Sequence, residues 1–190
     1  MSRRLVLAWL LAMAATLFLG VARADDPTVT RIDPVVRNGM LEIDADVDFE
    51  LNDQLRNAAE RGLTLYFTAD VAISHYRWYW FDEHVADAQM TWRIVYNALT
   101  RQWRVGTGEL TLPVSTLDEA MSMVRNVRNW PVAPIDRFDP DTRYEGRFRL
   151  RLDTSQLARP FQVNALNSSS WTPATNWTEF SFSVRGGESQ

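Results

Sequence analysis

The stretch LEIDADVDFEL, residues 41–51, alternates apolar and acidic residues without a break. A period of two places the two sets on opposite faces of a β-strand. A second stretch, LTLYFTADVAI at residues 63–73, alternates in the same way from Leu63 to Ile73. One apolar and one polar face are typical of antiparallel sheets that cover a core on one side only. These two stretches therefore predict an antiparallel β-domain.

Further strands follow from alternation and from turn residues between the runs. Asn38-Gly39 tolerates positive φ at both positions and predicts a tight turn before the run at 40–51. Pro34 is expected to end a short strand at 28–33, because proline lacks the N–H that a ladder needs. The other expected strands are 90–98 and 102–105, which form a hairpin, 144–152 and 179–184.

Two short helices interrupt the strands. Residues 52–61 carry a capping residue, a 3–4 spaced apolar stripe and a terminal Gly62. Residues 115–127 begin with Ser115 or Thr116 as the cap and have acidic residues in the first turn. Pro131, Pro134 and Pro140 predict an extended loop after the second helix. The expected fold is mostly β (α+β), an antiparallel β-sandwich-like domain with two short helices.

The N-terminus has the order of a secretion signal. Arg3 and Arg4 precede an uncharged apolar run from Leu5 to Leu19, and Ala22-Arg23-Ala24 offers small residues to a signal peptidase. We expect residues 1–24 to be a cleaved signal peptide and residues 25–190 to form one domain, with 186–190 as a disordered tail. The alternative is an uncleaved segment that anchors the chain in a membrane, and it differs in leaving residue 1 on the mature protein.

Charge and cysteine content exclude several classes of partner. With three arginines in the signal, the remaining chain has 17 basic and 24 acidic residues, a net charge of 17 − 24 = −7. Nucleic acids and anionic membrane surfaces both need a basic footprint, so neither is expected as a partner. The chain contains no cysteine, which excludes disulfides and thiol chemistry.

An aromatic ladder is the candidate binding surface. Tyr76, Trp78 and Trp80 share one strand face, with Arg77 and Asp82 beside them. The large residues change parity after residue 74, which predicts a bulge or a strand that passes from one sheet to the other. In the second case the rings belong to the core; in the first they form an exposed platform for a glycan or a peptide.

No catalytic or metal-binding motif is present. His75 and His84 flank Asp82 and Glu83, but their spacing does not place two imidazoles on one face. Neither a nucleophile elbow nor a zinc-protease helix motif occurs. We therefore expect no cofactor and no metal, and an unrecognised hydrolase is the least favoured function.

Two charged rows have matching alternation. Five acidic residues occupy one face of the run at 42–50, and three arginines occupy one face of the run at 147–151. If the two strands are neighbours, the rows would form ion pairs across the ladder, each stabilising by roughly 0.2–1 kcal/mol. A solvated sheet face is the simpler interpretation of the acidic row.

Five stretches of the chain have a distinctive wording. They are Leu55-x-x-Ala58-x-x-Arg61-Gly62-Leu63-x-Leu65-x-Phe67, then RWYWFD at 77–82, YNALTRQWRV at 96–105, LRLDTSQL at 150–157 and PFQVNAL at 160–166. Together they resemble a bacterial family of unknown function, DUF4390. One departure is Ala158-Arg159-Pro160, where the family has Pro-Lys-Pro.

The resemblance implies a Gram-negative envelope protein, located in the periplasm or, if the signal is uncleaved, anchored to the inner membrane. It implies no catalytic residues. It also associates the chain with a membrane sensor histidine kinase. The expected function is a non-enzymatic periplasmic interaction module that binds an envelope protein. The alternative is a glycan- or peptide-binding module that uses exposed tryptophans.

Overall fold

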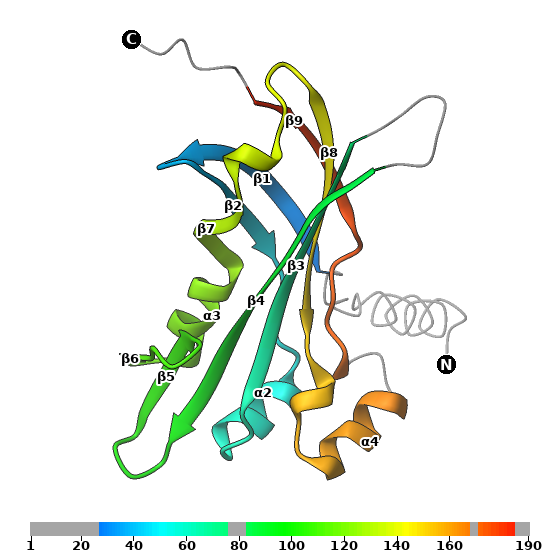
Figure 1. The fold of residues 1–190 in the computed structure, drawn as a ribbon. Coiled ribbons are helices and arrows are strands. Elements are labelled where there is room, and N and C mark those ends of the chain that lie inside the picture. The colour runs from blue at the N-terminus through cyan, green and yellow to red at the C-terminus, as the bar shows by residue number, and fades with distance from the viewer. Residues whose placement is uncertain (1–26, 76–82, 168–170, 185–190) are drawn as a thin grey trace, which may run out of the picture.

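Two antiparallel sheets make up the protein (Figure 1). The computed structural model describes residues 27–75, 83–167 and 171–184. One sheet has three strands in the order β1-β2-β7, and the other has six in the order β6-β5-β4-β3-β8-β9. The strands are β1 Thr28–Arg37, β2 Met40–Asp48, β3 Leu65–His75, β4 Glu83–Asn97, β5 Gln102–Thr107, β6 Leu112–Val114, β7 Asn126–Pro134, β8 Arg143–Leu152 and β9 Thr178–Ser183. The mostly β, sandwich-like fold expected from the sequence is confirmed.

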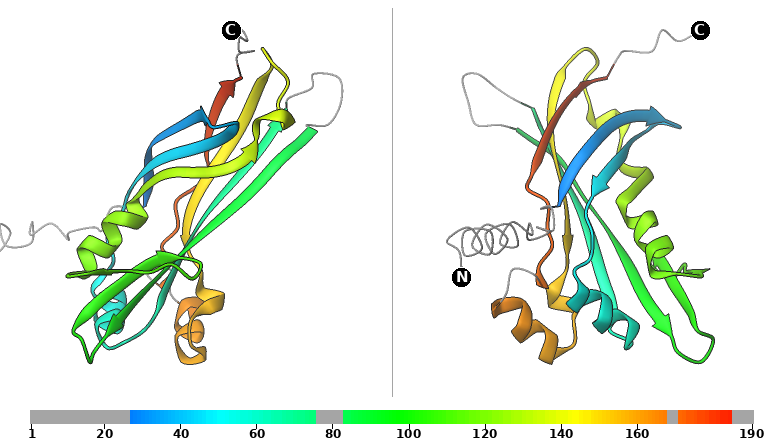
Figure 2. Two further views of the ribbon diagram at one scale, coloured as in Figure 1. Left: turned by 60° about the vertical axis from the view of Figure 1, so that its left-hand side comes forward. Right: turned by 180° about the vertical axis from the view of Figure 1, so that it is seen from behind.

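The two sheets lie against each other as two layers (Figure 2). The buried apolar side chains form one core. The apolar residues of the run at 41–51 are buried from the three-stranded side, and those of the run at 63–73 from the six-stranded side. Phe49 and Phe67 meet across the layers with ring centres 5.5 Å apart. The period-two pattern therefore places both strands correctly, with the apolar face of each inward.

The strands differ from expectation in two segments that contain proline. β1 continues through Pro34 to Arg37, because β1 is an edge strand and its outer side needs no amide donor. The segment expected as a proline-broken loop contains strand β7, again at an edge, with Pro131 paired to Glu42 and Pro134 paired to Met40. The Asn38-Gly39 turn is confirmed, with φ values of 51° and 74°.

The parity change near Ser74 coincides with a β-bulge. Ile73 pairs with Ala86 while Ser74 pairs with His84, so Val85 of β4 is the additional residue. This bulge belongs to β4, and the change of parity expected at residues 76, 78 and 80 lies outside the described residues and stays a prediction.

Three helices lie among the described residues: α2 Asp53–Glu60, α3 Leu117–Arg125 and α4 Arg159–Asn167. Asn52 caps α2 and Thr116 caps α3, each side chain accepting a backbone N–H three residues on. These two helices match the expected ones. The sequence patterns did not predict α4, whose apolar residues lack a clear helical stripe.

Candidate functional site

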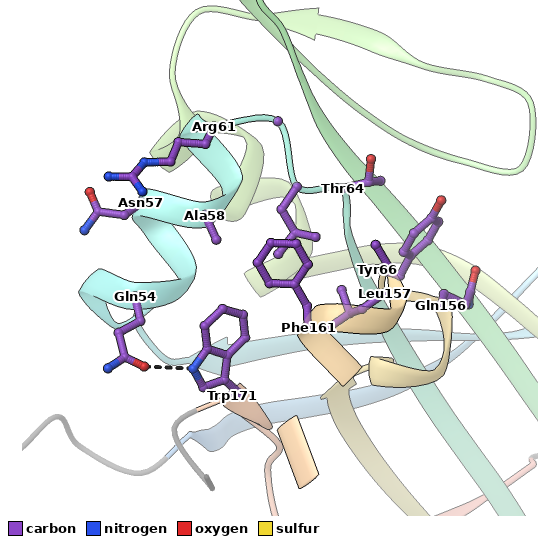
Figure 3. Close-up of a pocket in the computed structure, with 13 residues that line it drawn as sticks. Gln54, Asn57, Ala58, Arg61, Thr64, Tyr66, Gln156, Leu157, Phe161 and Trp171 are labelled. Carbon is purple, nitrogen blue, oxygen red and sulfur yellow. Dashed lines mark hydrogen bonds between the residues drawn. The ribbon is translucent and has the colours of Figure 1, made fainter. Parts of the chain in front are cut away.

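A groove opens between α2 and α4 at one end of the molecule (Figure 3). Its volume is about 890 Å³. We call it the α2–α4 groove. The side chains come from α2, the start of β3, the 3₁₀ turn η2 (Thr154–Gln156), α4 and Trp171. The lining residues are Gln54, Asn57, Ala58, Arg61, Gly62, Leu63, Thr64, Tyr66, Gln156, Leu157, Ala158, Phe161 and Trp171.

Local hydrogen bonds fix both walls of the groove. Gly62 has a φ of 97°, which lets the chain turn from the end of α2 into β3. On the other wall, the Asp153 side chain accepts from the N–H of Ser155 and from Gln156 Nε2. Gln162 Nε2 donates to the carbonyl of Leu157 at 2.8 Å, which ties α4 to η2. These bonds therefore hold the η2–α4 wall together.

The floor of the groove is apolar and aromatic. Leu63 and Leu157 are buried, and Phe161 stacks on Trp171 with ring centres 5.7 Å apart. Trp171 Nε1 donates to Gln54 Oε1 at 2.8 Å, so the buried indole has its polar group satisfied by α2. This floor offers apolar contact rather than hydrogen bonds.

The rim of the groove is polar and has one charge. Among the described residues, Arg61 is the single charged residue of the lining, and amides and hydroxyls supply the remaining polar groups. The ion pairs among the described residues do not include Arg61. By contrast, Arg56 on the same helix donates to Asp118 of α3 at 2.9 Å and lowers the pKa of that carboxyl. A cation at the rim of a groove with an apolar floor suits an apolar ligand that carries a negative charge.

A second polar cluster lies on the face of the six-stranded sheet that points away from the three-stranded sheet. We call this the outer sheet face. Asp70 is only 5 % exposed there. Its Oδ2 accepts from Arg149 Nη2 at 2.8 Å and from Arg151 Nε at 2.9 Å, and its Oδ1 accepts from Gln89 at 2.8 Å. The buried carboxylate is thus fully bonded within the protein.

Trp177 covers part of the same face. The guanidinium carbon of Arg149 lies 4.4 Å from the ring centre and that of Arg147 lies 4.8 Å from it, both within cation–π range. Trp177 is 38 % exposed. Because two guanidiniums already occupy its surroundings, this ring is a poor stacking platform for a sugar.

The acidic row of β2 has partners in its own sheet. Asp44 accepts from the Asn129 N–H at 2.7 Å and from Arg37 at 3.1 Å, and Asp46 pairs with Arg128. Burial tends to raise the pKa of Asp44, but the bonds from Asn129 and Arg37 outweigh it and lower that pKa. The expected pairing with the arginines of 147–151 is wrong, because β2 and β8 belong to different sheets.

The sequence-predicted surface of Tyr76, Trp78, Trp80, Arg77 and Asp82 lies outside the described residues, so both readings of the ladder stay predictions. His75 packs against Tyr144 with ring centres 5.5 Å apart, and His84 pairs with Asp87 at 3.0 Å. Within 27–75, 83–167 and 171–184, no group of three or more His, Cys, Asp or Glu residues is placed to hold a metal ion.

Sequence reasoning missed the groove, although its residues stood in the stretches that resembled a family. Arg61-Gly62-Leu63 and Leu157 belong to those stretches, as does Phe161. Their convergence depends on α4, which the patterns did not predict. The usable signal was the grouping of family-like stretches at the ends of strands, where loops carry function.

The fold and the groove define a β-rich two-sheet domain with a partly apolar groove at one end. In the described part of the chain, no helix has the length and apolar character needed to cross a membrane. The chain belongs to the family described as a domain of unknown function, DUF4390, whose model matches residues 24–181. No curated protein and no solved structure matches the chain.

Proposed function

We propose that the protein is a non-enzymatic interaction module of the bacterial envelope, and that the α2–α4 groove is its binding site. The ligand is an extended segment of a partner protein that carries an apolar side chain beside a carboxylate. The observation that supports this most is the combination of an apolar floor with Arg61 as the single charge of the lining. The partner class is an envelope protein such as a membrane sensor kinase.

Charge complementarity favours an acidic segment. The chain as a whole has more acidic than basic residues, yet the groove lining contains no carboxylate. A basic segment would therefore meet Arg61 without compensation. Buried aromatic anchors and arginines dominate binding energies at interfaces. The groove offers a pocket for an aromatic anchor and itself supplies an arginine, Arg61.

Peptide selection tests this proposal. A phage library of random nine-residue peptides is selected on the immobilised protein, and the peptides that bind are measured by titration calorimetry. We expect enrichment of Asp or Glu next to Phe, Leu or Trp. Arg61→Glu should weaken the binding of a selected peptide by at least about tenfold, since a like charge then faces its carboxylate.

Arg56→Gln is the matched control. Arg56 lies on the same helix as Arg61 but contacts Asp118 on α3 instead of the groove. The control should leave peptide affinity within about twofold. Selection of basic peptides, or equal loss of affinity in both variants, would contradict the proposal.

We also propose that the module works in the periplasm after removal of residues 1–24. The tripartite N-terminal sequence supports this. Mass spectrometry of the protein purified from an envelope fraction should give the mass of a chain whose first residue is Asp25. A full-length mass in the membrane fraction would instead support the uncleaved inner-membrane anchor.

A further inference from the structure

The start of β3 lacks a strand neighbour on one side. The N–H of Asp153 donates to the Tyr66 carbonyl at 2.7 Å, which ends the pairing of β3 with β8. The Asp153 side chain then accepts from the N–H of Ser155, and the chain turns into η2. On its other side β3 stays paired with β4 as far as Leu65, which lies opposite Ile94. β8 therefore does not extend beside the residues that precede Tyr66.

The backbone of Thr64 faces the place that β8 leaves. Burial alternates along residues 63–67, which indicates that the extended conformation begins before β3 itself. Residues two apart on such a strand direct their N–H and C=O groups to the same side, so Thr64 faces the β8 side as Tyr66 does. Within the described residues, neither backbone group of Thr64 has a hydrogen-bond partner. Thr64 lines the α2–α4 groove together with Leu157 of the opposite wall (Figure 3).

We propose that the segment bound in the α2–α4 groove is an extended strand that pairs with Thr64 and adds to β3 in the place that β8 leaves. This inference rests on the proposed function and specifies how the same groove binds its ligand. One residue of the segment exchanges two backbone hydrogen bonds with Thr64, as in an antiparallel pair. In this mode of recognition the main chain supplies affinity, and alternate side chains supply specificity.

The surroundings of Thr64 suit an extended segment that is both apolar and acidic. The segment residue opposite Thr64 shares the face of the Thr64 side chain, and its two neighbours share the face of Leu63. Leu63 is buried and belongs to the apolar floor, so an apolar neighbour reaches that floor. Arg61, three residues before Thr64, supplies the charge for a carboxylate. A helical segment bonds its own backbone internally and would leave the Thr64 groups without partners.

Backbone substitution in a selected peptide tests the strand pairing. Each amide of an acidic, apolar peptide is replaced in turn by an ester, which removes one N–H donor and keeps the side chain. We expect the affinity to fall by about fivefold to tenfold at the residue opposite Thr64, the effect of one lost hydrogen bond. Replacement at either neighbouring residue should change the affinity by less than about twofold, because those N–H groups face the other side.

Hydrogen exchange of the protein amides gives the second readout. NMR measures the exchange rate of the Thr64 N–H with and without saturating peptide. This amide should exchange at least about tenfold more slowly in the complex, because it gains an acceptor there. The Leu63 N–H already donates to the Ala58 carbonyl at 3.0 Å, so its rate should change by less than about threefold.

The outcomes separate this inference from the proposed function. Suppose that acidic peptides bind and Arg61→Glu weakens them, but that every ester position is equivalent or that Thr64 and Leu63 are slowed equally. The groove would then be a binding site, and the strand pairing would be wrong. If selection yields no acidic peptides, the proposed function and the strand pairing are both overturned.

Discussion

The α2–α4 groove and the outer sheet face use arginine in opposite ways. On the outer sheet face, Arg149 and Arg151 both bind Asp70, and Arg149 also lies against Trp177. In the groove, Arg61 lies at the rim and outside the ion pairs of the described residues. The first arrangement satisfies its charges internally, and the second leaves a charge for a ligand.

Because of this difference, substitutions on the outer sheet face should change the stability of the fold, and substitutions in the groove should change ligand binding. Removing one partner of a buried ion pair leaves the other charge without compensation. Substitutions at Asp70 should therefore lower the stability of the fold. A cation at an exposed rim contributes little to folding, so substitutions at Arg61 should act on a ligand.

The largest effect is expected for Asp70→Ala. Two guanidiniums would lose their shared acceptor, and we expect the free energy of unfolding to fall by about 3 kcal/mol. This value is at the lower end for a broken buried ion pair, because both arginine side chains are partly exposed to water. Urea denaturation measures it. Asp87→Ala is the control, since Asp87 is exposed and pairs with His84; its loss should stay below about 1 kcal/mol. Equal losses would contradict the central role of Asp70.

A smaller loss is expected for Asp44→Ala in the three-stranded sheet. Asp44 is 7 % exposed and accepts from the Asn129 N–H, where Asn129 has a φ of 50°. Removal of the carboxylate leaves that N–H and Arg37 without their acceptor, at a cost of about 2 kcal/mol. The same denaturation experiment measures the change. A loss below about 0.5 kcal/mol would mean that water replaces the carboxylate.

Acid should remove the contribution of the ionised Asp44 carboxylate to the stability of the fold. The folded-state pKa of Asp44 is lowered, so its contribution is complete above the ordinary pKa near 4 and is lost as the pH falls through the folded value. The stability gap between the parent and Asp44→Asn should therefore be constant from pH 5 to 7 and shrink below pH 4. A gap that grows below pH 4 would contradict this assignment.

Double-mutant cycles distinguish the two charged networks. Asp70→Ala and Arg149→Ala should show a coupling energy of about 1 kcal/mol or more, because the two side chains are bonded. Asp46→Ala and Arg149→Ala lie in different sheets and should be additive within about 0.5 kcal/mol. A coupling energy in the second cycle would instead support ion pairs between the acidic row at 42–50 and the arginines at 147–151.

The sequence predicted which face of each strand is buried better than it predicted which strands lie side by side. Alternation at 41–51 and 63–73 correctly assigned which residues are buried, because a strand has only two faces. It could not identify the partner of the acidic row, since pairing depends on strand order, and β7 follows β2 only after four intervening strands. The arginines that bind Asp44 and Asp46 are on β1 and β7, outside any charged row.

The groove was unpredictable for a related reason. Its two walls are separated by about a hundred residues, and α4 lacks the apolar periodicity that predicts a helix. The α2 wall was predicted correctly, from its cap at Asn52 to Gly62. Only the folded chain brings Gln54 within hydrogen-bonding distance of Trp171.

The most direct test compares Arg61→Gln with Arg149→Gln in two measurements on the same samples: the thermal melting temperature and the affinity for a selected acidic, apolar peptide. We predict that Arg61→Gln melts within about 2 °C of the parent but binds the peptide at least about tenfold more weakly, since an exposed rim charge adds little to folding. Arg149→Gln should melt several degrees lower with its peptide affinity unchanged. The reverse pattern, with Arg61→Gln destabilised and Arg149→Gln defective in binding, would contradict the assignment of the groove as the binding site.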